Sequence, residues 1–319
     1  MDNITHINVS SLSQATAELA KGKAEVVAGG TDLMTCLKGF ISDNLPEVIV
    51  NIKTIPDLVY IREDGGMLKI GALTTLTAIA NSSIVKEKYT ALAQAALAVG
   101  SPELRNMGTI GGNICQKPRC IYYRNEFNDF KCLRKDPQGI CNALTGVNRY
   151  HSIFGAIDGC VAPCPSDTAP ALVAFKAKIV TTKKVWEATE FFGNNGEKIN
   201  NLDDDEIITE IQIPAPATGT KSAYKKFAFR KAIDFPLVSA AAVISSSDAS
   251  VVLGGVYGIP RIATTAQDSI KGKTINAANA EAAGTAAATG AVALPPNNAN
   301  KYKIQVTMAL VKRAILACA

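Results

Sequence analysis

The stretch RNMGTIGGN, residues 105–113, is the starting point for understanding this sequence. It places three glycines within five positions, and the hydroxyl of Thr109 lies between the first two of them. Glycine tolerates positive φ and lets a ligand approach the backbone closely. The alternative for such a stretch is a tight loop in a β-rich domain. We call it the TIGG turn and treat it as a candidate ligand site.

A second glycine-rich motif lies upstream, in EVVAGGTDLMTCLKG at residues 25–39. Residues 26–27 predict a short buried strand, Gly29 and Gly30 open a turn, and Leu33 begins a helix. This order points backbone N–H groups at an anion, although it also occurs in plain connections. Because both glycine motifs carry a threonine, we expect both to face one diphosphate. Residues 28–33 are called the Gly-Gly-Thr turn below.

The composition is that of an ordinary globular protein of two or three domains. The chain has 319 residues, 47% of them hydrophobic and 19% charged, with a formal net charge of +5. Its basic residues form no tract, which argues against nucleic-acid binding. No apolar run reaches the roughly 18 residues that cross a bilayer, and the N-terminal segment lacks the features of a secretory signal. We therefore expect a cytoplasmic protein with no nucleic-acid or membrane partner.

Six of the eight cysteines fall within 50 positions after the TIGG turn. In a reducing compartment such clustering favours metal binding over disulfides, with free buried thiols as the alternative. No Cys-x-x-Cys pair is present, so the spacing of a zinc ribbon is absent. Wide intervals suit an iron–sulfur cluster held by a long loop, and basic neighbours suit its negative charge. The six are Cys115, Cys120, Cys132, Cys141, Cys160 and Cys164.

Hydrophobic patterning predicts an α+β fold in three parts, residues 1–55, 56–215 and 221–319. The first part reads strand–helix–strand–helix–strand. In the second we expect a hairpin of residues 58–63 and 67–70, helices at 74–81 and 89–99, and a strand at 206–214. In the third we expect a three-stranded antiparallel sheet of residues 222–230, 237–245 and 250–257, with helices at 279–289 and 302–317.

Few side chains suit acid–base or nucleophilic catalysis. The only histidines are His6 and His151, and neither lies near a G-x-S-x-G nucleophile motif. His151 lies inside the cysteine-rich segment, where it suits either a metal site or a packing role. Asp167 precedes an apolar run, as an N-cap or as a carboxylate for a sugar hydroxyl. We expect no catalytic side chain in this chain.

Taken together and in order, these motifs resemble the FAD-binding medium subunit of the molybdenum hydroxylases, the xanthine dehydrogenase and carbon monoxide dehydrogenase family. The resemblance covers nearly the whole chain. It implies two FAD-binding subdomains (PCMH/VAO-like), residues 1–55 and 56–215, followed by the C-terminal sheet and helices. The motifs are VVAGGTDL at 26–33, RNMGTIGGNIC at 105–115, PSDTAPAL at 165–172, EIITEIQIP at 206–214, YKKFAFRKAIDFPLVSAA at 224–241, LGGV at 253–256 and KYKIQVTMALVKRAI at 301–315.

The resemblance also implies which residues hold FAD. The Gly-Gly-Thr turn would wrap the diphosphate through its backbone, and the TIGG turn would form a second diphosphate loop. Asp167 would accept a hydrogen bond from a sugar-chain hydroxyl, Ile208 would pack beside the isoalloxazine ring, and Lys226 would lie near the polar edge of the ring. The turns contribute Ala28, Gly29, Gly30, Thr31, Asp32 and Leu33, and Thr109, Gly111, Gly112 and Asn113.

One segment departs from most of the family, whose members pass from the Gly-Gly-Asn motif to the Ser-Asp motif in a few residues. Here 52 residues separate Asn113 from Ser166. This insertion, residues 114–165, is called the cysteine loop; it resembles the extra 4Fe–4S loop of 4-hydroxybenzoyl-CoA reductase and of periplasmic aldehyde oxidoreductases. The implied ligands are Cys120, Cys132, Cys141 and Cys160, with Cys115, Cys164 or His151 as replacements for one of them.

The family further implies an electron-transfer subunit with FAD and a 4Fe–4S cluster as cofactors. It would relay electrons between a small 2Fe–2S subunit and an external electron carrier, while a large subunit with molybdenum cofactor acts on the organic substrate. One alternative is a stand-alone flavin oxidoreductase with flavin but no iron. Another is a cluster-bearing redox sensor with iron but no flavin, against which the two intact glycine turns argue.

Overall fold

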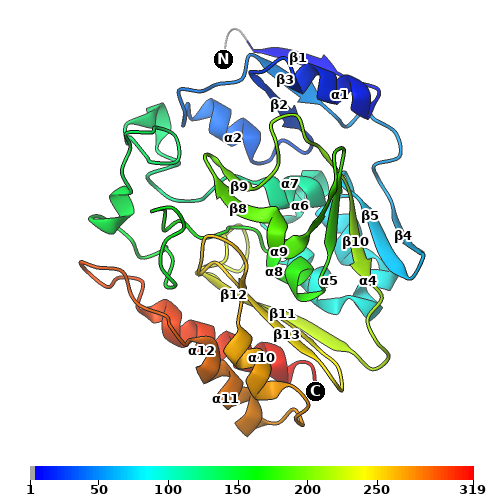
Figure 1. Ribbon diagram of the computed structural model, residues 1–319, viewed down its shortest axis with the longest axis vertical. Coiled ribbons are helices and arrows are strands. Elements are labelled where there is room, and N and C mark those ends of the chain that lie inside the picture. Colours follow the sequence, from blue (N-terminus) through cyan, green and yellow to red (C-terminus); the bar gives the residue numbers. More distant parts are fainter. Residues whose placement is uncertain (1–3) are drawn as a thin grey trace.

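The computed structural model describes residues 4–319. Figure 1 shows three parts arranged along the long axis, with the N-terminal strands at one end and the C-terminal helices at the other. The cysteine loop lies along one side, between these ends. This arrangement puts the middle part in contact with both of its neighbours.

The N-terminal part is a parallel three-stranded sheet in the order β1-β3-β2, with a helix in each crossover. The strand–helix–strand–helix–strand prediction is confirmed. Ser11 caps α1 by accepting a hydrogen bond from the Gln14 N–H at 3.2 Å, and the helix buries Ala15 and Leu19. The elements are β1 (Thr5–Asn8), α1 (Leu12–Leu19), β2 (Ala24–Val27), α2 (Leu33–Lys38) and β3 (Val48–Asn51).

The middle part contains a five-stranded sheet in the order β4-β5-β10-β6-β7. The predicted hairpin is confirmed as β4 and β5, whose turn holds Gly65 and Gly66 at φ of 58° and 74°. The predicted strand at 206–214 is β10, at the centre of the sheet. The elements before the cysteine loop are β4 (Ile61–Asp64), β5 (Met67–Gly71), α3 (Leu76–Asn81), α4 (Ser83–Lys88), α5 (Thr90–Leu97), α6 (Pro102–Met107) and α7 (Ile110–Cys115). Those after it are α8 (Thr168–Ala174), β6 (Lys178–Thr181), β7 (Val185–Glu187), α9 (Ala188–Phe191), β8 (Phe192–Asn195), β9 (Lys198–Asn200) and β10 (Ile208–Pro214).

The C-terminal part differs from the prediction in its sheet. The antiparallel sheet has four strands in the order β11-β12-β13-β14, so the expected count of three is wrong. The fourth strand has only two residues, Arg261 and Ile262, which is too short to give an alternating pattern. The elements are β11 (Lys221–Phe227), β12 (Val238–Ile244), β13 (Ala249–Gly254), β14 (Arg261–Ile262), α10 (Thr264–Ile270), α11 (Ala277–Ala287) and α12 (Tyr302–Leu316).

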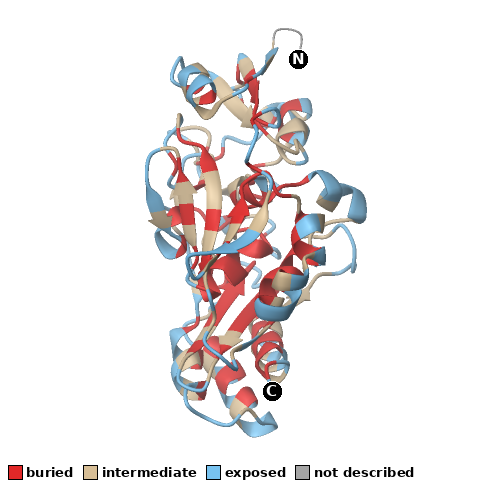
Figure 2. Cartoon of the chain, turned by 90° about the vertical axis from the view of Figure 1, so that its right-hand side faces the viewer, coloured by how far each residue is buried: buried red, intermediate tan, exposed pale blue. Residues whose placement is uncertain are grey.

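Both faces of this C-terminal sheet are buried. Alternate residues of β12 point to opposite faces, so Ala241 packs with the core of the middle part while Ala240 and Ala242 pack under the C-terminal helices. Figure 2 shows this continuous burial running from the middle part into the C-terminal sheet. The sheet therefore fixes the C-terminal helices to the middle part.

The cysteine loop has little regular structure. It contains two single-turn 3₁₀ helices, Glu126–Asn128 and Asn142–Leu144, and isolated bridges that include Cys132 with Ile140. Several of its side chains are nevertheless fully buried, among them Tyr123 and Ile153. The loop is thus packed against the rest of the chain rather than extended into solvent.

Candidate functional site

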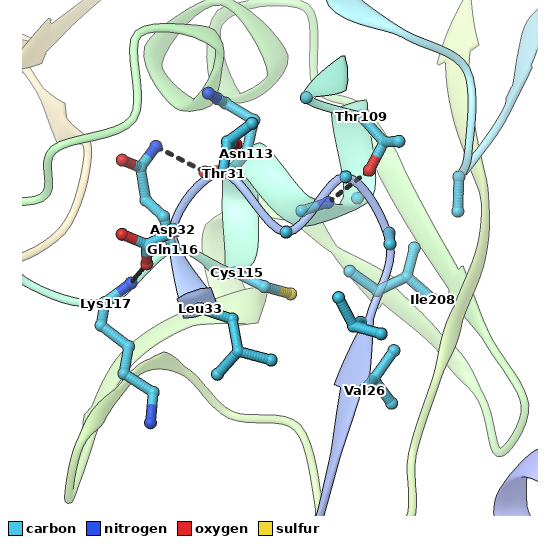
Figure 3. A pocket seen from close by; sticks show the side chains of 18 of the residues that line it. Val26, Thr31, Asp32, Leu33, Thr109, Asn113, Cys115, Gln116, Lys117 and Ile208 are labelled. Carbon is cyan, nitrogen blue, oxygen red and sulfur yellow. Dashed lines mark hydrogen bonds between the residues drawn. The ribbon is translucent and has the colours of Figure 1, made fainter. Parts of the chain in front are cut away.

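The two glycine turns line one cavity of about 470 Å³. Figure 3 shows the Gly-Gly-Thr turn leading from β2 into α2, with Thr109 and Asn113 of α7 beside it. Every residue predicted for the two turns lies on the lining of this cavity, as do Asp167 and Ile208. The volume is within the range of about 300–1,000 Å³ found for cofactor and ligand sites.

The two turns touch each other through their backbones. A Cβ atom on Gly29 would lie 2.7 Å from the carbonyl carbon of Met107 and closer still to its oxygen, so only glycine fits there. Gly30 adopts a φ of 69°, which also favours glycine. The N–H of Leu76 donates to the Gly108 carbonyl at 2.9 Å and holds the second turn in place. The glycines thus allow two segments some 80 residues apart to form one wall.

The Gly-Gly-Thr turn offers free hydrogen-bond donors. No acceptor among residues 4–319 lies within hydrogen-bonding reach of the backbone N–H groups of residues 29–33. Residues 29–33 are half-buried or exposed, and unpaired N–H donors grouped beside a cavity suit an anionic group. The cavity therefore fits the diphosphate of an extended dinucleotide on this side.

The glycine N–H groups of the TIGG turn are already paired with protein acceptors. The Gly111 N–H donates to Ala72 O at 3.0 Å, and the Gly112 N–H donates to Thr109 Oγ1 at 3.1 Å. Asn113 Oδ1 accepts hydrogen bonds from Ser166 and Thr168 at 2.6 and 2.7 Å. This turn shapes the cavity and ties α7 to α8, while the Gly-Gly-Thr turn has the free N–H groups.

The side chain of Asp32 is turned toward the cysteine loop. Its carboxylate accepts hydrogen bonds from the Lys117 N–H at 2.8 Å, from Arg119 Nη2 at 2.5 Å and from Arg124 Nη2 at 2.7 Å. Figure 3 shows the bond from Asp32 to the backbone of Lys117. Three of the roughly four acceptor sites of this carboxylate are taken by donors of the cysteine loop, so Asp32 links the turn to the loop.

Asp167 lies at the cavity wall, 2% exposed, and both carboxylate oxygens are paired. Tyr224 donates to one at 2.5 Å and Lys226 Nζ to the other at 2.9 Å. Burial raises the pKa of Asp167, while Lys226 and Tyr224 act in the opposite direction. The alternative N-cap role is not seen, because Ser166 Oγ, rather than Asp167, accepts the bond from the Ala169 N–H.

Lys226 does not line the cavity. Its Nζ donates to Asp167 and to Ala98 O at 2.9 Å. Any effect of Lys226 on a ligand therefore passes through Asp167. Ile208, by contrast, lies on the wall at the start of β10, as Figure 3 shows.

The cysteines separate into groups. A second, small cavity is lined by all four of the cysteines that the family resemblance implied, which are Cys120, Cys132, Cys141 and Cys160. Cys115 lies instead on the wall of the large cavity, and Cys164 lies in the main core. His151 Nε2 is 3.1 Å from Cys120 Sγ. The fold thus brings together four cysteines that lie far apart in the sequence.

Burial disfavours the thiolate form at three of these four cysteines. Burial raises the pKa of Cys120 to about 12 and also raises the pKa of Cys132 and of Cys160. Burial also lowers the pKa of His151 to about 4. Among residues 4–319, no group of three or more His, Cys, Asp or Glu side chains is placed to hold a single metal ion. The thiolates around a cluster of several irons lie farther apart than the ligands of one ion. The described residues therefore lack a site for a single metal ion, which is a different requirement from that of a cluster.

Sequence reasoning missed several residues of the site. Lys117, Arg119 and Phe235 line the large cavity, and Cys36 packs beside Cys120 and Cys132 while accepting a bond from Arg124 at 3.0 Å. The basic character of the loop was visible in the sequence. The sequence did not show which of these basic residues reach the cavity, because their partners lie more than 80 positions away.

The comparisons with known proteins place the chain in one family. Residues 2–216 match the FAD binding domain in molybdopterin dehydrogenase, and residues 222–318 match the CO dehydrogenase flavoprotein C-terminal domain. The chain therefore belongs to the flavoprotein subunits of molybdenum hydroxylase-type oxidoreductases.

Individual relatives agree with this class. The chain is 31% identical over 265 residues to the aldehyde oxidoreductase FAD-binding subunit PaoB of Escherichia coli K12, covering 80% of this chain and 81% of that protein. It is 28% identical to the carbon monoxide dehydrogenase medium chain of Hydrogenophaga pseudoflava, covering 96% and 94%. A carbon monoxide dehydrogenase structure from the latter organism matches the fold with a TM-score of 0.76 and 24% identity, over 99% of this chain and 97% of that one. In the part of the chain that the structure describes, no helix combines the length and apolar character of a membrane span.

Proposed function

We propose that this chain is the FAD- and 4Fe–4S-containing electron-transfer subunit of a multi-subunit molybdenum-cofactor oxidoreductase. It would relay electrons between a 2Fe–2S subunit and an external acceptor or donor, in the cytoplasm. Residues 1–55 and 56–215 would form the two FAD-binding subdomains, and residues 221–319 the C-terminal domain. FAD supplies one- and two-electron redox chemistry when bound, and the protein supplies binding, orientation and electrostatics.

The unpaired N–H groups of the Gly-Gly-Thr turn carry the flavin half of this proposal. They line a cavity of cofactor size, against a second turn that approaches closely enough to exclude any side chain at Gly29. In this arrangement residues 29–33 would bind the diphosphate, and Asp167 would act on the sugar chain from a fixed position. Ile208 would pack against the isoalloxazine ring. Lys226 would hold Asp167 rather than contact the cofactor.

The shared cavity of Cys120, Cys132, Cys141 and Cys160 supports the cluster half. Four cysteine thiolates are the ligand set of a 4Fe–4S cluster. Burial raises the pKa of the Cys120, Cys132 and Cys160 thiols, so these three are protonated at neutral pH and cluster binding would release their protons. Arg134 Nη1 lies 3.8 Å from Cys160 Sγ and would favour the thiolate form. The residues present therefore fit the group.

Cofactor content is the test of the proposal. Anaerobically purified, reconstituted protein should contain about four irons, four sulfides and one FAD per chain, with a visible spectrum of both cofactors. A Cys→Ser change at any of the four positions should lower the iron content and leave FAD in place. Cys318→Ser, in the C-terminal helix region outside the loop, is the matched control.

Each outcome has a separate meaning. FAD without iron after anaerobic reconstitution would refute the cluster assignment and favour a flavin subunit with an unexplained insertion. Iron without FAD would refute the flavin assignment. Partner subunits would be identified by co-purification with a protein that contains molybdenum cofactor, and a chain that binds no such subunit would refute the multi-subunit role.

A further inference from the structure

The charge balance of the large cavity raises the question of what neutralises a bound diphosphate. Seven acidic and three basic side chains line the cavity. Two of the basic ones face acids of their own, since Lys117 Nζ lies 3.1 Å from Glu25 and Lys198 Nζ lies 2.5 Å from Asp204. An anionic ligand in such surroundings needs a further positive group.

Arg119 is the third basic side chain, and its donors are mostly unused. Nη2 donates to Asp32 at 2.5 Å, Nε is buried without a partner, and nothing in residues 4–319 accepts from Nη1. A guanidinium group has five N–H donors, so four of them lack a protein acceptor. The side chain is 25% exposed, which leaves it accessible from the cavity.

Arg124 bonds to the same carboxylate, but four of its five N–H donors are used by protein acceptors. Its Nε donates to Pro118 O at 2.7 Å, Nη1 to Cys36 Sγ at 3.0 Å, and Nη2 to Asp32 and to Lys117 O. It does not line the cavity. Two guanidinium groups on one carboxylate leave a net charge of +1 directly beside the Gly-Gly-Thr turn.

The orientation of Arg119 is fixed from two sides. Its Cζ lies 4.0 Å from the centre of the Phe235 ring, and Asp32 holds one edge of the guanidinium. Phe235 comes from the connection between β11 and β12 and lines the same cavity. A stacked, anchored guanidinium loses little conformational freedom when it binds an anion.

We propose that Arg119 of the cysteine loop binds the diphosphate of FAD, and that Asp32 and Phe235 position its guanidinium for that contact. The inference rests on the proposed function, because it takes FAD as the ligand of the cavity. It gives the cysteine loop a part in the flavin site that does not depend on an iron–sulfur cluster. It also makes Asp32 a positioning residue rather than a ligand of the cofactor.

Titration of the full-length chain, freed of flavin, with FAD and with riboflavin tests the proposal, because riboflavin has no phosphate. Arg119→Gln should weaken FAD binding by about 10- to 100-fold and riboflavin binding by less than about threefold. Arg119→Lys keeps the charge without the planar fork and should give an intermediate loss for FAD alone. Lys131→Gln, which removes an exposed positive charge from the same loop, should leave both affinities unchanged.

Equal losses of FAD and riboflavin would show a general structural effect and would overturn the proposal, as would unchanged FAD binding. If Arg119→Gln does not fold, Arg119→Lys decides by the same comparison of the two flavins. Wild-type protein that binds FAD no better than riboflavin would contradict this inference alone. Wild-type protein that binds neither flavin would contradict the proposed function.

Discussion

Replacement of Gly29 by alanine should force the two glycine turns apart. The new methyl group would lie 2.7 Å from the Met107 carbonyl carbon and 3.1 Å from Gly108 Cα, whereas ordinary contacts begin at 3.4 Å. The neighbouring backbone would have to move by at least about 0.7 Å, and further at the Met107 carbonyl oxygen, which the methyl group would approach most closely. Backbone shifts of this kind cost about 1–3 kcal/mol in a packed site. The obstacle is main chain, so no side-chain rotation can relieve it.

Two measurements follow from this displacement. The melting temperature of flavin-free Gly29→Ala protein should fall by several degrees, and the Kd for FAD should rise by at least about tenfold, the equivalent of 1.4 kcal/mol. Gly112→Ala is the comparison variant, because its methyl group would meet a single side-chain atom, Thr109 Oγ1, at 3.1 Å rather than main chain. A Gly29→Ala protein with the wild-type melting temperature and FAD affinity would refute the claim that the turns are in backbone contact.

Three other substitutions test the buried polar groups. Lys303→Met should lower the free energy of unfolding in urea by about 3 kcal/mol, because three backbone carbonyls lose their donor. Burial lowers the pKa of Lys303 from 10.5 to about 7. The difference in unfolding free energy between wild type and variant should therefore grow as the pH rises between these values. Lys226→Met leaves the buried Asp167 carboxylate without its cation, which should cost about 3–5 kcal/mol near pH 7. Burial raises the pKa of Asp167, so the cost should become smaller as the pH falls and the carboxylate becomes protonated. Asn113→Ala should cost about 1–3 kcal/mol for each of the two hydroxyls that lose their acceptor, and Asn113→Asp, which keeps an acceptor, should cost less in the same unfolding assay.

Elements with a strong local signal could be predicted from the sequence. The Asp64-Gly65-Gly66 turn dictated the β4–β5 hairpin, and the period-two pattern of residues 206–214 gave β10. Three six-residue helices, α4, α6 and α7, were missed, although their caps are legible. Ser101 with Pro102 starts α6, and Ser82 starts α4, but six residues are too few to establish a helical period.

The site was less accessible to sequence reasoning than the fold. Motifs pointed to the residues that line the large cavity, but not to the direction of their side chains. Asp32 and Asn113 appeared as cofactor contacts, yet Asp32 bonds to groups 85 to 92 positions away and Asn113 to groups 53 and 55 positions away. Such pairings depend on tertiary structure, and no local pattern encodes them.

The cysteine loop shows how a segment of about 50 residues without regular structure is held in one conformation. Its backbone polar groups must be paired once buried, and side chains from outside the loop do much of this work. Asp32 accepts from the loop near its start, while Lys303 of α12 donates to the carbonyls of Tyr150 and His151 near its end. Asn300 donates to Ser152 O at 2.7 Å beside them.

Both anchors lie in parts of the chain that flank the middle part on opposite sides. The loop is therefore attached to the N-terminal and C-terminal parts by charged and amide groups and by Cys36, none of which is one of the four proposed cluster ligands. It follows that much of its conformation is set by the fold of the whole chain before any cofactor is added. A proposed cluster would then bind to thiols already gathered in one cavity, and Arg119 would be held at the flavin cavity whether or not iron is present.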